Sequence, residues 1–112
     1  MKKRYVLTLD LKNDQALIRE YEKYHQDVWP EIKESILTAG IMDMEIYRWE
    51  SRLFMIMEVD EKFSFEKKAA LDANNPKVQE WENLMSRFQQ ALQGSLPGEK
   101  WQLMHNIFSL NS

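Results

Sequence analysis

Two hydrophobic periods alternate along this 112-residue chain, and their order leaves few possible folds. From Tyr5 to Leu11 apolar side chains occupy alternate positions, which is typical of a half-buried strand. In the next segment they recur every three or four residues, the period of a helix, at Leu17, Tyr21, Tyr24, Val28 and Ile32. A chain that switches between these periods predicts an α+β fold, in which helices pack against a sheet.

Pro30 interrupts the helical period. Proline disfavours helical geometry in the residue before it, here Trp29, and is itself well suited to the first turn of a new helix. We therefore expect two helical pieces, at residues 14–25 and 30–38, with a break between them. Gly40 follows the second piece, and glycine is the usual helix terminator.

The rest of the chain continues the alternation of strands and helices. The predicted elements are a strand at 41–49, a turn at 50–52, a strand at 53–59, a helix at 63–71, a helix from Pro76 through Leu92, a loop at 94–98 and a strand at 100–109. The overall order is strand, helix, strand, strand, helix, strand. This is the ferredoxin-like pattern, a four-stranded antiparallel sheet with helices on one face.

The strand predicted at 41–49 carries apolar side chains on both of its faces. Strict alternation places Met42, Met44 and Ile46 on one face, and Ile41, Tyr47 and Trp49 on the other. Because helices cover only one face of the sheet, the other face would be open and apolar. We therefore expect a homodimer that pairs sheet against sheet.

Composition restricts the partners of the chain. The length is that of a single compact domain, residues 1–112. A net charge of -3 gives no basic surface for nucleic acid, and no apolar stretch approaches the roughly 20 residues that span a membrane. The first apolar run is short and broken by Asp10, so we interpret it as a strand and not as a signal peptide. A soluble cytoplasmic protein is expected.

Several common catalytic signatures are missing from the sequence. The chain has no cysteine, no H-E-x-x-H motif, no serine in a G-x-S-x-G context, and only three scattered glycines. These absences argue against a metal site, covalent serine chemistry and a phosphate-binding glycine loop. Cofactor-free proton transfer and plain ligand binding remain.

His25 is the first candidate for acid–base chemistry. It lies four residues after Tyr21, so the two side chains share one helix face. It also lies near the predicted end of its helix, where the dipole favours the protonated imidazole. A histidine near its reference pKa of about 6.5 can give or take a proton at neutral pH. The alternative is a packing or surface histidine.

Two further ionisable residues lie on predicted strands. His105 alternates with Leu103 and Ile107 on the last strand, so we expect a half-buried structural histidine there. Glu45, in the strand at 41–49, is a candidate acid, base or hydroxyl acceptor if it faces the open side of the sheet.

The segment Tyr21-x-x-x-His25-x-x-x-Trp29-Pro30-Glu31 resembles the helix signature of the L-rhamnose mutarotase family. The resemblance covers about residues 4–110. It continues through Gly40, Ile46-Tyr47, Leu53-Phe54, Glu58-Val59, Val78-Gln79-x-Trp81, Met85 and Ile107-Phe108-x-Leu110. It implies a ferredoxin-like dimeric α/β barrel that interconverts the α and β anomers of L-rhamnose, with neither a metal nor an organic cofactor.

The resemblance also implies roles for individual residues. His25 matches the catalytic histidine, Tyr21 a sugar-contacting tyrosine, and Trp81 the first of two adjacent tryptophans. The second of these tryptophans is replaced by Glu82, and a further sugar-contacting tyrosine by Met44. Both replacements alter which hydroxyls the substrate-binding pocket can recognise, so L-fucose is an alternative substrate to L-rhamnose.

The implied mechanism opens the cyclic hemiacetal of the sugar and closes it on the other face. Opening removes one proton from the anomeric hydroxyl and delivers one to the ring oxygen, and His25 would handle one of these transfers. Tyr21 would orient His25 or hold a hydroxyl, and Trp81 would stack on the apolar face of the sugar. The second proton carrier stays open between Glu45, Glu82 and water.

Two other functions are compatible with these residues. One is a cofactor-free or haem-handling monooxygenase built on the same barrel. The other is a non-catalytic sugar-binding module, for which pairing of sheet faces alone explains the apolar strands.

Overall fold

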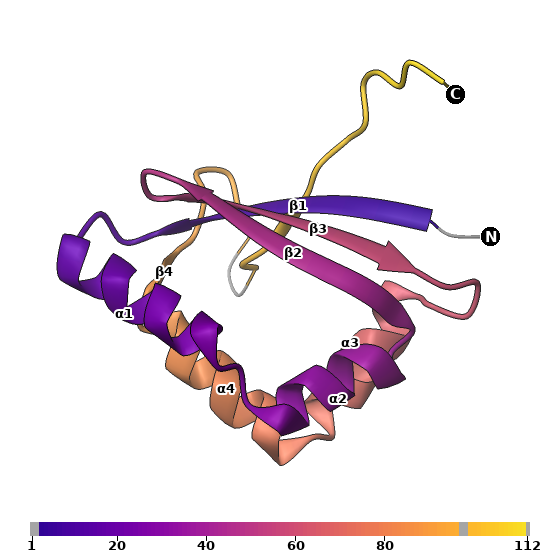
Figure 1. The fold of residues 1–112 in the computed structure, drawn as a ribbon, viewed down its shortest axis with the longest axis horizontal. Helices are drawn as coiled ribbons and strands as arrows, with labels where there is room; N and C mark the ends of the chain where they lie inside the picture. Colours follow the sequence, from indigo (N-terminus) through magenta and orange to yellow (C-terminus); the bar gives the residue numbers. More distant parts are fainter. Residues whose placement is uncertain (1–2, 97–98, 112) are drawn as a thin grey trace.

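The computed structural model describes residues 3–96 and 99–111. Within these residues an antiparallel sheet carries helices on one face and is open on the other (Figure 1). The elements are β1 (Lys3–Leu11), α1 (Gln15–Gln26), α2 (Pro30–Thr38), β2 (Ile41–Trp49), β3 (Arg52–Val59), α3 (Phe65–Ala73), α4 (Pro76–Ser86), β4 (Gln89–Gln90) and β5 (Gln102–Leu103). In this described part of the chain, no helix is long and apolar enough to cross a membrane.

The strand order of the sheet is β2-β3-β1-β4, and β5 also pairs with β1. β1 and β3 run antiparallel, with Lys3 opposite Val59. β4 pairs with β1 at Leu11 and β5 pairs with it at Leu7, so these two short strands together occupy the place of the predicted fourth strand. The ferredoxin-like fold predicted from the sequence is therefore confirmed. The sheet of one chain is not closed into a barrel.

The predicted break between the first two helices is confirmed. The carboxylate of Asp14 begins α1 by accepting hydrogen bonds from the backbone N–H groups of Ala16 and Leu17. α1 ends at Gln26, and Pro30 occupies the first turn of α2. Because of this break, the last turn of α1 lies within the helical layer and is not the middle of one longer helix.

The predicted distribution of side chains on β2 is wrong at the start of the strand. A bulge follows Ile41 in the pairing with β3 and adds one residue to β2, which shifts the alternation. Ile41 is therefore buried in the core that Met44 contacts, whereas Met42 is exposed. Beyond the bulge the alternation is as predicted, because Ile46 packs against the core and Tyr47 is exposed.

α4 ends earlier than predicted. It stops at Ser86, and the backbone N–H of Phe88 donates to the oxygen of Met85 at 3.0 Å, which tightens the final turn. Phe88 is still buried, but its own backbone oxygen accepts a hydrogen bond from Lys12, which directs the chain into β4. The apolar period through Leu92 therefore correctly predicted that Phe88 is buried, but it predicted a helix that is too long.

The last strand is much shorter than predicted. Only Gln102–Leu103 pairs with β1, and the following segment leaves the sheet and projects from the body (Figure 1). Ile107 and Phe108 are 90% and 75% exposed, and His105 is exposed as well. The prediction of a half-buried His105 is therefore wrong. Alternating apolar residues predict a strand that packs one face against another surface. Within one chain, the segment that carries His105 and Ile107 does not pack against such a surface.

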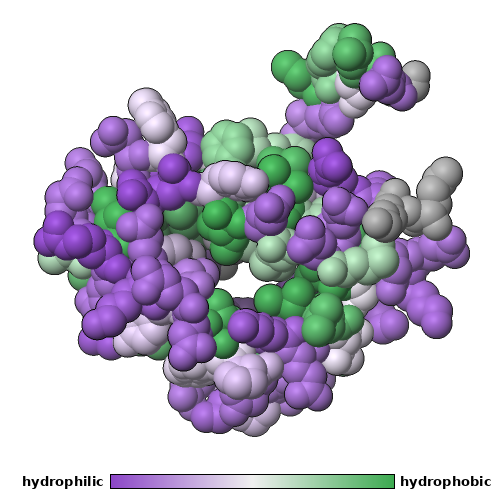
Figure 2. All heavy atoms as spheres, viewed as in Figure 1, coloured by the Kyte–Doolittle hydropathy of each residue, from purple (hydrophilic) through white to green (hydrophobic). Residues whose placement is uncertain are grey.

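Most of the buried apolar side chains form two clusters on the helix-covered face of the sheet. The first cluster contains Leu11, Ile18, Tyr21, Ile32, Leu53, Val78, Trp81, Met85 and Phe88. The second contains Leu7, Ile41, Met57 and Val59. Ile36 and Trp101 pack against both clusters. The space-filling view shows a hollow between the sheet and the helical layer, with hydrophobic side chains at its rim (Figure 2). This hollow lies on the helix-covered side of the sheet.

Candidate active site

A group of aromatic side chains gathers where the end of α1 meets α4, and we call it the aromatic cluster. Its members are Tyr21, Tyr24, His25, Trp29, Trp81 and Phe88. Helical spacing places Tyr21 and His25 on one face of α1, as the sequence predicted. The ring of Trp81 meets that of His25 from α4. The cluster therefore surrounds the histidine that the sequence nominated for acid–base chemistry.

The imidazole of His25 is half-buried between two aromatic rings. Its centroid lies 4.3 Å from that of Tyr21, with an angle of 32° between the rings. Its centroid lies 5.6 Å from that of Trp81, at 66°, an edge-on contact. These contacts restrict rotation of the imidazole and give it a largely apolar environment.

A backbone hydrogen bond determines which nitrogen of His25 carries the proton. Nδ1 lies 2.9 Å from the main-chain oxygen of Tyr21. A carbonyl oxygen only accepts hydrogen bonds, so Nδ1 is the donor in this contact. In the neutral imidazole the other nitrogen, Nε2, then has a free lone pair and can take a proton.

The environment of His25 favours this neutral form. Burial lowers the pKa of His25 from its ordinary value of 6.5, and the hydrogen bond to the Tyr21 carbonyl offsets part of that effect. Removal from water therefore outweighs the helix-end effect predicted from the sequence, which would have favoured the protonated imidazole. At neutral pH, His25 is a base with one nitrogen available.

Tyr21 is almost completely buried, with 3% of its surface exposed. Burial raises the pKa of its hydroxyl to about 12, and a side-chain hydrogen bond with Gln89 partly opposes the rise. An amide lowers the pKa of a phenol by donating an N–H to the oxygen, so this contact involves Nε2 of Gln89. Tyr21 therefore stays protonated in the neutral range and links His25 to Gln89.

The other polar atom of the Gln89 side chain has no partner. Its Oε1 is buried and accepts no hydrogen bond from any described residue. A buried acceptor left in this state costs about 1–3 kcal/mol. Such groups are uncommon in native proteins, and each one calls for an explanation.

Two tryptophans close one side of the aromatic cluster. The ring centroids of Trp29 and Trp81 are 5.0 Å apart with an angle of 71° between the planes. Trp29 lies in the break between α1 and α2, and the Lys77 ammonium lies 5.6 Å from its ring centroid. The break forced by Pro30 therefore brings a second indole next to Trp81.

The remaining predicted site residues lie apart from His25 or face another way. Met44 packs against the second hydrophobic cluster, on the helix-covered face of the sheet. Glu45 faces the open side, where its Oε2 accepts a hydrogen bond of 3.3 Å from the exposed Tyr47. Glu82 is exposed on α4, although it directly follows Trp81. Within one chain the structure thus brings together His25, Tyr21 and Trp81, but not the two glutamates.

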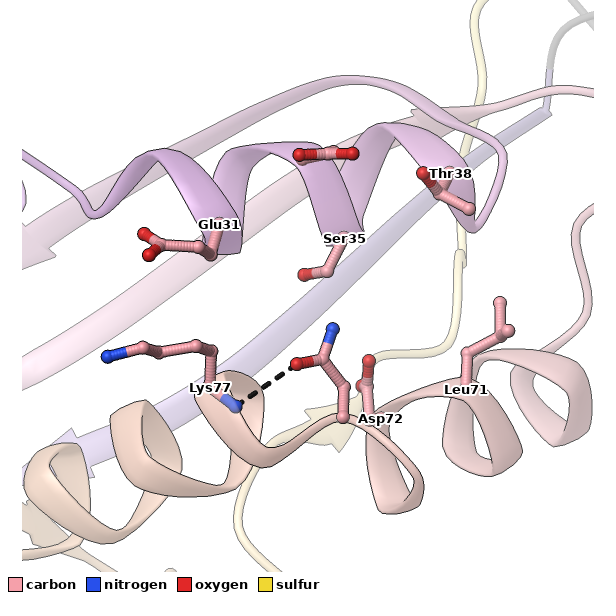
Figure 3. Close-up of a pocket in the computed structure, with 8 residues that line it drawn as sticks. Glu31, Ser35, Thr38, Leu71, Asp72 and Lys77 are labelled. Carbon is pink, nitrogen blue, oxygen red and sulfur yellow. Dashed lines mark hydrogen bonds between the residues drawn. The ribbon is translucent and has the colours of Figure 1, made fainter.

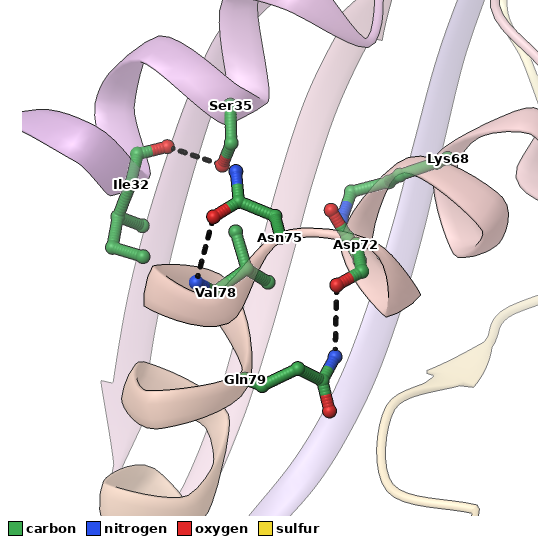
Figure 4. Close-up of polar contacts among 7 residues, drawn as sticks. All are labelled: Ile32, Ser35, Lys68, Asp72, Asn75, Val78 and Gln79. Atoms are coloured by element: carbon green, nitrogen blue, oxygen red, sulfur yellow. Dashed lines mark hydrogen bonds and ion pairs between the residues drawn. The ribbon is translucent and has the colours of Figure 1, made fainter.

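A separate groove lies between α2 and the α3–α4 turn and has a volume of about 270 Å³ (Figure 3). It is lined by Glu31, Glu34, Ser35, Thr38, Leu71, Asp72, Asn75 and Lys77. Several of its polar groups form hydrogen bonds within the α3–α4 turn. Asn75 caps α4 by accepting from the N–H of Val78, and Gln79 donates to the main-chain oxygen of Asp72 (Figure 4). The carboxylate of Asp72 pairs with Lys68. This groove is therefore mainly a structural feature of the helical layer.

Across residues 3–96 and 99–111, no three His, Cys, Asp or Glu side chains are grouped as ligands of a metal ion would be.

The protein-family model for L-rhamnose mutarotase matches residues 4–110. The chain belongs to the L-rhamnose mutarotase family. The family resemblance expected from the helix signature is thus confirmed, and the chain is an isomerase that interconverts sugar anomers.

Relatives within the mutarotases act on more than one sugar. The chain is 49% identical to an L-fucose mutarotase of Xanthomonas campestris, over 96% of this chain and 88% of that protein. It is 32% identical to an L-rhamnose mutarotase of Phocaeicola vulgatus, over 61% of this chain and 64% of that protein. The crystal structure of an L-rhamnose mutarotase from Formosa agariphila matches with a TM-score of 0.71 and 21% identity, over 96% of this chain and 98% of that one. This structural likeness supports the fold.

Sequence reasoning missed Gln89, which the structure places beside Tyr21. Gln89 and Gln90 are two polar residues after a helix, and this pattern indicates a loop more readily than a buried strand. The one available signal was Phe88, an apolar residue in register with the stripe of α4. It showed that the chain stays close to the core beyond the helix.

Proposed function

We propose that a 6-deoxy sugar binds against the aromatic cluster and that His25 moves the protons that open and close its ring. The observation that carries this proposal is the contact that sets the tautomer of His25. Its Nδ1 is engaged by the Tyr21 carbonyl, and burial keeps the ring neutral. Nε2 is thereby available as a base for a neutral substrate.

The proton steps balance with a single imidazole. Nε2 of His25 takes the proton of the anomeric hydroxyl while the bond between C1 and the ring oxygen breaks and the C1 carbonyl forms. The resulting imidazolium returns the proton to the departing ring oxygen, which was bonded to the same carbon until this step and is therefore close to the same nitrogen. Rotation about C1–C2 and the reverse steps give the other anomer. Acid–base assistance of this kind contributes about 10²–10⁴-fold.

This relay needs no carboxylate beside His25. That agrees with the positions of Glu45 on the open face of the sheet and Glu82 on the exposed side of α4. We assign the apolar contacts of the sugar to Trp81, which suits stacking on a ring face, and to Met44 on the interior face of the sheet. Tyr21 positions His25 through their stacked rings.

L-fucose is the proposed preferred sugar. The relative with the higher identity and the longer match is an L-fucose mutarotase, whereas the L-rhamnose mutarotase of Phocaeicola vulgatus matches over 68 residues only. The replacement of an expected tryptophan by Glu82 and of an expected tyrosine by Met44 is consistent with a pocket that recognises a different hydroxyl pattern.

A homodimer is the proposed assembly. The open face of the sheet carries Tyr47 and Phe54 opposite one another on β2 and β3, and both are exposed. Trp49 at the end of β2 is 78% exposed, and Ile107 and Phe108 project from the body. Apolar surface of this extent is suited to a second copy of the chain, which would also supply the packing surface that the last segment lacks. A single domain over residues 1–112 and a cytoplasmic location stay predictions.

The proposed function is tested by two-dimensional exchange NMR, which measures the rate of transfer between the α and β H1 signals of each sugar. We expect the protein to accelerate exchange of L-fucose above the buffer rate and to act on L-rhamnose at least 10-fold more slowly, a difference within the range of one hydroxyl contact. Buffer rates on both sugars would contradict the mutarotase proposal. Equal rates would contradict only the preference for L-fucose.

A further inference from the structure

We propose that Gln89 is a further substrate-binding residue, whose side-chain oxygen accepts a hydrogen bond from one ring hydroxyl of the sugar. This inference rests on the proposed function and deepens it. The helix signature of the family does not include this residue, since Gln89 lies on β4, outside α1 and α4.

The strand register places Gln89 on the same side of the sheet as the aromatic cluster. Gln89 is the partner of Leu11 in the antiparallel pairing of β4 with β1. Directly opposed residues project from the same face, and Leu11 is buried in the first hydrophobic cluster together with Tyr21. Gln89 therefore faces the helical layer, and its hydrogen bond with Tyr21 agrees with this placement.

The two polar atoms of this amide have different roles. The Tyr21 hydroxyl and this amide share a hydrogen bond, in which the N–H at Nε2 is the donor. Oε1 is buried without a donor among the described residues. Because Tyr21 stacks on His25 at 4.3 Å, the unsatisfied oxygen is only one side chain away from the imidazole. A ligand held on Oε1 is thereby positioned relative to the proton-transferring nitrogen.

The chemistry of this unpaired oxygen selects the ligand. A neutral amide oxygen accepts hydrogen bonds and carries no charge to attract an ion, so it suits an uncharged donor. Sugar hydroxyls are such donors, and each points in a direction that differs between epimers. A site that leaves a buried acceptor unpaired when the hydroxyl is absent or inverted discriminates strongly against the wrong sugar. Gln89 is therefore a specificity-determining residue.

The test is a cycle between Gln89→Met and the removal of single sugar hydroxyls. Methionine is close to glutamine in length but lacks both polar atoms. Exchange NMR gives kcat/KM for L-fucose and for its 2-, 3- and 4-deoxy derivatives. We expect Gln89→Met to lower kcat/KM on L-fucose by about 10–100-fold, mainly through KM, the range for an unpaired buried group. On one deoxy derivative, the one that lacks the contacting hydroxyl, the substitution has almost no effect.

Gln90→Met is the matched control, because Gln90 is the neighbouring residue of β4 and is exposed. It leaves all four rates unchanged. If Gln89→Met instead lowers the rate equally on all four sugars, the hydroxyl contact is wrong and Gln89 has only a structural role. If the wild-type protein exchanges none of the sugars, the proposed function fails as well, so the two failures are distinguishable.

A measurement on the wild-type protein covers the case in which Gln89→Met does not fold. The side-chain amide protons of Gln89 are followed by NMR during titration with L-fucose. A hydrogen bond to Oε1 polarises the amide, so we expect these resonances to shift with the same apparent Kd as the His25 ring signals. Saturating sugar that moves the His25 signals but not those of Gln89 would overturn the proposal.

Discussion

Nδ1 of His25 lies 2.9 Å from the main-chain oxygen of Tyr21, one helical turn earlier in α1. The backbone of the helix therefore holds the imidazole in one tautomer, a task that a carboxylate performs in many acid–base sites. A carboxylate partner would raise the pKa of the histidine by its charge. The neutral carbonyl raises it less than burial lowers it, so orientation is gained while Nε2 stays unprotonated.

The lowered pKa of His25 predicts how the exchange rate depends on pH. The base form is the active form, so the rate is constant through pH 7 and falls only at acidic pH, where the imidazole becomes protonated. The midpoint of this fall lies below 6.5, the ordinary value for histidine. A pH series of exchange NMR on L-fucose measures it. A midpoint at or above 6.5 would contradict the assigned environment of His25.

The same shift predicts how stability depends on pH. The folded protein resists protonation of His25, whereas the unfolded chain takes up a proton below pH 6.5, so the unfolded state binds more protons in acid. His25 therefore has no effect on the free energy of unfolding above that pH and decreases it as the pH falls below. Urea denaturation at pH 7.5 and 5.0 should show a smaller decrease for His25→Gln than for the wild type. Identical decreases would show that His25 is not buried as described.

Removal of the Tyr21 hydroxyl should destabilise the protein. Tyr21→Phe retains the ring contact with His25 but leaves the Gln89 amide without its acceptor, so that both polar atoms of a half-buried side chain are unpaired. The expected loss is about 1–3 kcal/mol in the free energy of unfolding. Tyr47→Phe is the control, since its exposed hydroxyl makes only a 3.3 Å bond with Glu45. Equal losses in the two variants would argue against a buried Tyr21–Gln89 bond.

The proposed dimer predicts that a charge on the open face of the sheet produces monomers. Trp49→Lys places an ammonium in the apolar surface formed with Tyr47 and Phe54, where burial of an unpaired charge is costly. Sedimentation equilibrium should give the mass of two chains for the wild type and of one chain for the variant. Leu37→Lys, at an exposed apolar residue of α2, should remain dimeric. A monomeric wild type would contradict the assembly.

Most of the fold could be predicted because its elements carry strong local signals. Pro30 and the helical period predicted the break between α1 and α2, and the period-2 pattern predicted β1 to β3. The start of β2 was mispredicted because the bulge after Ile41 arises from pairing with β3, which the local pattern does not encode. The last strand was overextended because the alternation at Ile107 predicts a partner surface without saying which chain provides it.

The candidate site likewise contains residues that could be predicted from the sequence and residues that could not. Tyr21 and His25 are four residues apart on one helix, so their contact follows from sequence spacing alone. Trp81 reaches them through the packing of α4, and its place depended on the family resemblance. Gln89 could not be predicted, because its position results from the register of a two-residue strand against Leu11. The side of the sheet on which Glu45 lies likewise depends on the bulge in β2.

The most direct test of the catalytic account is the rate of exchange between the α and β anomers of L-fucose in the presence of His25→Gln, measured by two-dimensional exchange NMR. Glutamine can still donate to the Tyr21 carbonyl but cannot take up a proton at Nε2. We predict a rate about 10²–10⁴-fold below that of the wild type, for a variant that is still folded at pH 7.5. His105→Gln, at the exposed second histidine, should keep the wild-type rate. A His25→Gln variant that is folded and exchanges the sugar as fast as the wild type would contradict the account.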